Sequence, residues 1–241
     1  MTPDLPRLYA ALDATWPAAA MVEAGPWRLR EGAGGGKRVA CTTAEGDWGP
    51  DDLHAAEKAQ HLLGQVPLFM IRQGEVALDA ALEAEGYALI DPVNLWLCPI
   101  ARLTDRPLPR VTAFAVWEPL AVMREIWAAG GIGPARVAVM DRAAGPKTGI
   151  FGRMSDRPAG AGYCAVHDRI AMVHALEVLR AHRGMGLGKW MMRCAGIWAE
   201  SQGAEWMALA CLRDNHAANG LYAALGMDLV GQYHYRIKVA A

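Results

Sequence analysis

The amino-acid sequence predicts an α/β protein of the α+β type, in which a mixed central β-sheet is flanked by helices and built from two tandem halves. The first observation is an internal repeat: residues 69–99 and 209–239 share the order apolar strand, short loop, amphipathic helix, glycine, and two strands joined by a polar turn. The second is a charged, proline-containing segment between the repeats, which interrupts both periodicities. The third is the alternation of strand and helix patterns in the second half.

The repeat and the linker together place the boundary between the halves. Gly86 corresponds to Gly226, an offset of 226 − 86 = 140 residues. Residues 101–110 contain two prolines and four charged side chains, as expected of a linker. We therefore expect one domain at residues 1–105 and another at residues 106–241.

The first half begins with strand patterns around a glycine-rich stretch. Residues 26–43 predict two strands joined by a hairpin, and residues 51–63 predict a helix capped by Asp51. Three consecutive glycines, 34–36, are also compatible with a phosphate loop, but the strand signals on both sides favour the hairpin. The strand, helix and paired strands of the repeat follow.

The second half predicts the order αα, βββ, α, β, α, ββ. Two short helices come first, and Pro134 suits the first turn of the second helix. The later elements are recognised by alternating apolar residues in the strands and by helical periodicity after the glycine-rich turn. The expected ranges are helices 118–129, 134–144 and 189–203, and strands 147–154, 160–168, 171–179 and 206–212.

Composition excludes several function classes. The 241 residues are 53% hydrophobic and 20% charged, enough apolar sequence for a sizeable core. Lysine and arginine (24) nearly balance aspartate and glutamate (25), so no overall field favours nucleic acid or an anionic membrane as a partner. The N-terminus does not resemble a secretory leader and no apolar run reaches the ~20 residues of a membrane span, so we expect a cytoplasmic protein. The five cysteines contain no CxxC pair, so neither disulfides nor a metal site are expected.

Three alternating glycines, Gly184, Gly186 and Gly188, stand between a predicted strand and a predicted helix. Such a turn lets several backbone N–H groups point into one concavity at a helix N-terminus, which favours an anion such as phosphate. A turn that needs glycine only for close packing is the alternative. A dinucleotide fingerprint would require glycine at position 189, and a P-loop would require serine or threonine where Trp190 stands.

The spacing RxxGxG at residues 183–188 resembles the signature of the GNAT superfamily of acyl-CoA-dependent N-acyltransferases. A second block supports the resemblance, because Asn215, Ala218, Leu221, Tyr222 and Gly226 match the family pattern N..A..LY..LGF, with Met227 in place of phenylalanine. The resemblance covers about residues 111–238. It implies a GNAT fold, acetyl-CoA as cosubstrate, and a fork in the sheet between the strand that ends at Val178 and the strand around Leu209.

The resemblance also implies which residues bind the cosubstrate. Arg180 is a further nearby cation, and for it, Arg183 and Lys189 the alternative is a solvated surface at the helix start. For Asn215 the alternative is a helix cap. The residues expected to bind acetyl-CoA are Leu176, Val178, Arg183, Gly184, Gly186, Leu187, Gly188, Lys189, Asn215 and Tyr222.

Acyl transfer to an amine requires a proton acceptor, an oxyanion donor and a proton donor for the thiolate. Tyr222 matches the family's tyrosine and is the expected general acid, although an amphipathic helix also buries tyrosine in a core. The backbone N–H of Val178 is the expected oxyanion donor. Glu177 is the expected general base, with His174, His167 and Asp168 as competitors. The side chains expected to shape the acceptor pocket are Met154, Tyr163 and Tyr233.

The first half is expected to be degenerate. At the offset of 140 residues, Leu82 stands for Tyr222 and Glu75 for Asn215, and no RxxGxG precedes the helix. We expect this half to supply a wall of the acceptor site or to mimic a dimer partner. The sequence thus predicts an N-acetyltransferase acting on a primary amine of a small molecule or peptide, as a monomer or homodimer. A catalytically silent acyl-CoA sensor or interaction module is the alternative.

Overall fold

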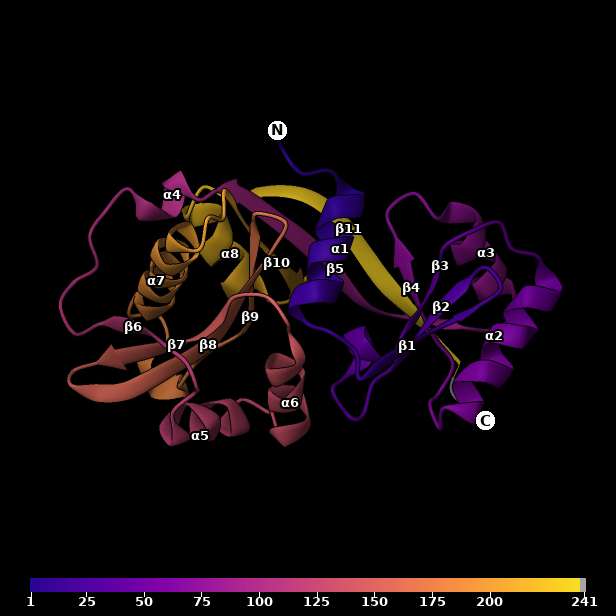
Figure 1. The fold of residues 1–241 in the computed structure, drawn as a ribbon, viewed down its shortest axis with the longest axis horizontal. Helices are drawn as coiled ribbons and strands as arrows, with labels where there is room; N and C mark the ends of the chain where they lie inside the picture. Colours follow the sequence, from indigo (N-terminus) through magenta and orange to yellow (C-terminus); the bar gives the residue numbers. More distant parts are fainter. Residues whose placement is uncertain (239–241) are drawn as a thin grey trace. The chain divides into compact units, whose positions relative to one another are not determined.

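The computed structural model describes residues 1–238, which form two compact units (Figure 1). Each unit contains part of a mixed β-sheet with helices packed on it. Unit 1 comprises residues 1–17, 95–211 and 215–230, and unit 2 comprises residues 18–94, 212–214 and the chain from Gly231 onward.

The units are interleaved along the sequence. Strand β5 (Ala88–Pro99) begins in unit 2 and ends in unit 1, whereas β11 (Asp228–Ile237) begins in unit 1 and continues in unit 2. The predicted pairs of strands joined by a polar turn are therefore wrong, because each pair is one long strand. β11 obtains its hydrogen-bond partner from β4 (Leu68–Arg72), with which it pairs antiparallel, and does not fold back on itself. The division into halves at residue 105 stays a prediction about the repeat.

The predicted repeat itself is confirmed by the structure. Helices α3 (Val76–Ala84) and α8 (His216–Ala224) begin 216 − 76 = 140 residues apart, and β5 and β11 begin at the same offset, 228 − 88 = 140. In both copies the helix N–H groups and the following glycine make corresponding backbone hydrogen bonds. The glycines have left-handed φ angles, 81° at Gly86 and 74° at Gly226. Each helix thus ends in the same glycine turn before its long strand.

Unit 2 contains the sheet order β1-β2-β3-β4-β11-β5. The predicted strands around the glycine-rich stretch pair antiparallel, with Trp27 opposite Ala44. Its core gathers Trp27, Phe69 and Tyr87 against the apolar faces of the two helices. The remaining elements of unit 2 are β1 (Ala20–Ala24), β2 (Trp27–Glu31), η1 (Lys37–Val39), β3 (Thr42–Ala44) and α2 (Pro50–Leu62).

Unit 1 contains the sheet order β5-β10-β9-β8-β7-β6, in which β9 and β10 are parallel and β9, β8, β7 and β6 pair antiparallel in turn. Its remaining elements are α1 (Leu5–Thr15), α4 (Ala101–Thr104), β6 (Ala113–Val116), α5 (Ala121–Ala129), α6 (Pro134–Arg142), β7 (Lys147–Met154), β8 (Arg157–His167), β9 (Ile170–Val178), η2 (Arg180–His182), α7 (Leu187–Ser201) and β10 (Trp206–Leu212).

Helices cover both faces of the sheet in unit 1. Helix α7 packs on the face that carries Cys164 and Val173 of β8 and β9. Helices α1 and α5 also contact β8 and β9, where Tyr163 and His174 lie beside Trp16 at the end of α1. Since β-strand side chains alternate between faces, the two sets occupy opposite sides of the sheet.

Three local expectations need correction. Helix α2 begins at Pro50, so Asp51 is not its cap; the cap position is Gly49, whose N–H donates to the Asp52 carboxylate at 2.8 Å. The expected linker contains the short helix α4. The strand patterns did not indicate β1 or β6, and helix α1 was not predicted.

Candidate functional site

A bulge in β9 shapes the strand next to the glycine-rich turn. The β8–β9 register shifts between Ala161, opposite Glu177, and Tyr163, opposite His174. Ala175 takes up the extra residue with a left-handed φ of 51°, and its carbonyl accepts a hydrogen bond of 2.9 Å from Trp127 Nε1. Helix α5 therefore fixes the position where the strand changes direction.

The fork predicted between β9 and β10 is present. The parallel pairing ends at Met172 and Ala208, although β9 continues to Val178. The Leu179 N–H donates to Ala159 of β8 at 2.9 Å, which makes Val178 and its partner Gly160 a non-hydrogen-bonded pair. The N–H and C=O of Val178 consequently face away from β8, on the side of the fork.

The turn between β9 and α7 has the conformation of an anion nest. Gly184 and Gly186 have φ angles of 76° and 83°, and Gly186 is the N-cap residue of α7. An added Cβ at either position would meet no protein atom within 4 Å, so the backbone conformation itself requires glycine there. The first N–H groups of a 15-residue helix are available to an anion at this end.

The nest and the fork open into one cavity of about 440 Å³. All ten residues expected to bind acetyl-CoA line this cavity, and so does Glu177. Sequence reasoning missed two of its lining residues, His182 and Ala217, which carry no motif of their own but flank positions that do. The residues that line the cavity are Leu176, Glu177, Val178, His182, Arg183, Gly184, Gly186, Leu187, Gly188, Lys189, Asn215, Ala217, Ala218, Leu221 and Tyr222.

Two charged residues of the cavity form an ion pair. Arg183 Nη2 lies 2.7 Å from Glu177 Oε1, and Arg183 Nε donates to the Val178 carbonyl at 2.9 Å. The Glu177 side chain is only 17% exposed, whereas that of Arg183 is 60% exposed. Glu177 also lies against Gly130 at the end of α5, where an added Cβ would come within 2.7 Å of the carboxyl group. The expected base and the expected phosphate ligand are therefore partners in this structure.

Helix α8 brings Asn215 and Tyr222 to the opposite wall. Asn215 Oδ1 accepts from the Ala218 N–H at 3.1 Å, so its side chain caps the helix. Tyr222 is 6% exposed, and its ring centroid lies 6.3 Å from that of Trp96. Burial, with a smaller effect of Cys211, raises the pKa of Tyr222, so its phenol stays protonated at neutral pH.

The competing candidates for the general base lie elsewhere in unit 1. His174 is buried; Thr15 Oγ1 donates to the Ala11 carbonyl at 2.6 Å and so accepts from His174 Nε2 at 2.9 Å. His167 and Asp168 lie at the turn before β9, about 25 Å along the strand from Val178. Asp168 forms an ion pair of 2.7 Å with Arg7.

The side chains expected to shape the acceptor pocket are not brought together. Met154 ends β7, and the Tyr163 hydroxyl donates to the Met140 carbonyl at 3.1 Å inside the core of unit 1. Tyr233 belongs to unit 2. Arg180, in η2, does not line the cavity.

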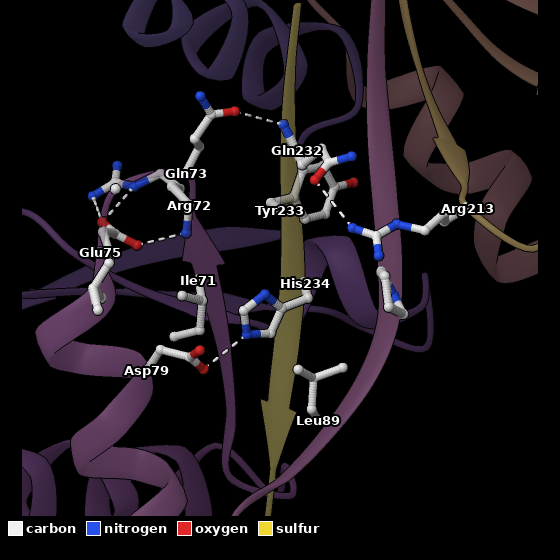
Figure 2. A pocket seen from close by; sticks show the side chains of 13 residues that line it. Ile71, Arg72, Gln73, Glu75, Asp79, Leu89, Arg213, Gln232, Tyr233 and His234 are labelled. Carbon is white, nitrogen blue, oxygen red and sulfur yellow. Dashed lines mark hydrogen bonds and ion pairs between the residues drawn. The ribbon is translucent and has the colours of Figure 1, made fainter. Parts of the chain in front are cut away.

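Unit 2 has a cavity of about 340 Å³ beside α3, but its polar groups are engaged with one another (Figure 2). Glu75, which stands where unit 1 has Asn215, binds the backbone N–H and the guanidinium of Arg72. His234 contacts Asp79 at 2.8 Å, as Figure 2 shows. Leu82, which stands where unit 1 has Tyr222, is fully buried. This cavity has no glycine nest like that of unit 1.

Two searches of residues 1–238 returned nothing. No group of three or more histidine, cysteine, aspartate or glutamate side chains is arranged to hold a metal ion. Across the same residues, no helix combines the length and the apolar character needed to cross a membrane.

Comparison with known proteins agrees with this geometry. The sequence model of the Acetyltransferase (GNAT) family matches residues 116–227. A curated relative, the "Uncharacterized N-acetyltransferase YobR" of Bacillus subtilis (strain 168), is 29% identical, with 98% of this chain and 99% of that protein covered.

Solved structures show the same fold. A GCN5-related N-acetyltransferase from Kribbella flavida superimposes with a TM-score of 0.75 at 17% identity, covering 100% of this chain and 98% of that one. A tandem GNAT protein from the clavulanic acid biosynthesis pathway superimposes with a TM-score of 0.61 at 14% identity, covering 94% and 86%.

Proposed function

Residues 116–227 are a domain of the GNAT family of N-acetyltransferases, and on that premise we propose that unit 1 transfers the acetyl group of acetyl-CoA to a primary amine of a small molecule or peptide. The observation that carries the proposal is the single cavity that joins the nest at Gly184 and Gly186 to Tyr222 through the fork of the sheet.

The residues of the cavity fit the parts of acetyl-CoA. The nest and the start of α7 suit the pyrophosphate, and Lys189 adds a cation at the same helix end. The fork leaves main-chain groups of β9 without a strand partner, which suits the amide-bearing pantetheine arm. We propose that Arg183 exchanges its ion pair with Glu177 for the pyrophosphate when the cosubstrate binds.

Direct attack by the amine requires three groups of this chain. Glu177 accepts a proton from the amine, directly or through water, as the nitrogen bonds to the carbonyl carbon. The Val178 N–H donates to the carbonyl oxygen on which negative charge develops. Tyr222 gives its phenolic proton to the sulfur as the C–S bond breaks, and the proton taken up by Glu177 returns to solvent while the phenol is reprotonated.

The phenol of Tyr222 suits the role of acid. Its raised pKa means that the proton is present throughout the neutral range, and a thiolate leaving the acetyl group is a strong enough base to receive it. Unit 2 offers neither a nest nor a tyrosine at the corresponding position, so we propose one catalytic site in each chain.

An acetyl-CoA turnover assay tests the function. The purified chain is incubated with acetyl-CoA and a panel of small amines, amino acids and peptides, and thiol release is measured against a no-acceptor control. We expect release that depends on at least one amine and a product heavier by one acetyl group. Binding of acetyl-CoA without transfer to any amine would favour an acyl-CoA sensor.

A further inference from the structure

A second cavity of unit 1, about 420 Å³ in volume, lies between α4, the start of α7 and the end of α8. Four of its lining side chains are cationic, Arg102, Arg106, Lys189 and Arg193, and the acidic one is Asp105. The balance of the lining is therefore 4 − 1 = 3 positive charges. We call this cavity the basic pocket.

The cations of the basic pocket are held in different ways. The Arg193 side chain is 8% exposed and donates to Asp105 Oδ1 and to the Leu103 carbonyl. Arg102 donates to the Gly226 carbonyl. Arg106 is 70% exposed and lies 3.7 Å from the other Asp105 oxygen, so it is only loosely engaged. Asp105 thus serves two arginines and leaves the pocket with an excess of guanidinium donors.

The basic pocket adjoins the cavity that contains the nest. Lys189 lines both cavities, and it stands three residues after Gly186 at the start of α7. Arg193 follows one helical turn later, about 6 Å along the axis. Trp190 lies between these two cations in sequence and also lines the basic pocket. An anion seated on the nest therefore has a second cationic site within the reach of one nucleotide.

We propose that the basic pocket binds a phosphate monoester, and specifically the 3′-phosphate of the coenzyme A whose pyrophosphate occupies the nest. This inference rests on the proposed function. Coenzyme A carries its 3′-phosphate on the ribose whose 5′-oxygen bears the pyrophosphate, so the two anionic groups are joined by one sugar. A phosphate monoester has three oxygens and nearly two negative charges, which matches several converging guanidinium and ammonium donors.

The test compares coenzyme A with 3′-dephospho-coenzyme A, which keeps the pyrophosphate and lacks only the monoester. Isothermal titration at low salt should give a dissociation constant at least about tenfold lower for coenzyme A in the wild type. Arg106→Gln should weaken coenzyme A about threefold or more and leave 3′-dephospho-coenzyme A unchanged. Arg110→Gln, an exposed arginine of the same linker outside the pocket, is the matched control and should change neither affinity.

The outcomes separate this inference from the proposed function. Equal affinities for the two compounds in the wild type, or equal losses in Arg106→Gln, would overturn the 3′-phosphate assignment while leaving acetyl-CoA binding intact. Binding of neither compound would overturn the proposed function as well. Inorganic phosphate distinguishes the source of the monoester: if it binds the pocket equally well with and without Arg106, or if it stabilises the chain while the two coenzymes bind equally, the pocket is not the 3′-phosphate site.

Discussion

The indole Nε1 of Trp96 donates a hydrogen bond of 2.9 Å to Oδ1 of Asn219, although the two residues lie 123 positions apart. Its counterpart in unit 2 is the bond from Arg236 Nε to Asp79 Oδ1, because 236 − 96 and 219 − 79 both equal 140. In each case a long strand contacts the helix of the other repeat. The Trp96 ring also lies against Tyr222, so the exchanged strand supports the proposed acid.

We therefore expect a fragment of residues 106–241 not to fold on its own. It lacks the part of β5 that lies beside β10, and it lacks helix α1 on the opposite face of β8 and β9. Circular dichroism and thermal unfolding should show no cooperative transition for the fragment, whereas the full chain should unfold cooperatively. A fragment that unfolds cooperatively and binds acetyl-CoA as the full chain does would contradict this.

The Arg183–Glu177 ion pair predicts a division of labour that a double-mutant cycle can measure. Glu177→Gln should lower kcat by about 10²-fold or more with little change in acetyl-CoA affinity, because a general base is lost. Arg183→Gln should weaken acetyl-CoA by about tenfold, because one charged contact to the pyrophosphate is lost. Matching losses of both parameters in both variants would show that the pair acts only in holding the turn.

Gly130 offers a way to move Glu177 without replacing it. Gly130 ends α5 with an ordinary negative φ of −88°, so alanine is compatible with its backbone. The new Cβ would come within 2.7 Å of the Glu177 side chain, whose end can rotate away. Gly130→Ala should therefore reduce kcat while acetyl-CoA affinity and the melting temperature change little. An unchanged kcat would argue against a positioned carboxylate at this site.

Tyr222→Phe tests the general acid. Only one hydroxyl is removed from a ring that still packs beside Trp96, so the fold and the acetyl-CoA dissociation constant should be preserved within about tenfold, while kcat falls by about 10²- to 10⁴-fold. The wild-type rate should show no loss from Tyr222 ionisation as pH rises from 7 to about 10, because the raised pKa keeps the acid form populated. Full turnover by the variant at every pH would exclude the role.

Raised tyrosine pKa values also carry a sign for stability. Burial raises the pKa of Tyr87, Tyr163, Tyr222 and Tyr235 above the ordinary value of 10.0. Above pH ~10 the unfolded chain loses these phenolic protons while the folded chain retains them, so the free energy of unfolding should fall as pH rises beyond that point. Below pH ~10 both states keep the protons and this contribution is constant.

The sequence predicted the elements that depend on local pattern and missed those that depend on strand partners. The repeat, the glycine nest and the lining of the site were accessible because glycine spacing and helical periodicity are local properties. The exchange of β5 and β11 was not, since Asp91-Pro92 and Gly231-Gln232 resemble turn sequences but lie inside continuous strands. Asp91 adopts a left-handed φ of 46°, which absorbs the irregularity without reversing the chain.

Side-chain pairing in the site was equally hidden from the sequence. Glu177 and Arg183 were assigned separate roles, and their contact depends on the fold of the turn between β9 and α7. Helix α1 carries no motif, yet Thr15 and Trp16 contact His174, one of the expected bases. Tertiary contacts of this kind are set by topology, which a single sequence does not state.

The central claim is one acetyl-CoA site in each chain, built on the nest at Gly186, and calorimetric titration tests it most directly. Gly186→Val and Gly203→Val are matched variants, because both glycines flank α7 with left-handed φ angles, 83° and 79°, and neither Cβ would meet a protein atom within 4 Å. Each should cost about 1–2 kcal/mol of stability. We predict one acetyl-CoA per chain in the wild type and in Gly203→Val and no measurable binding in Gly186→Val; two equivalent sites per chain, or unchanged binding in Gly186→Val, would contradict the account.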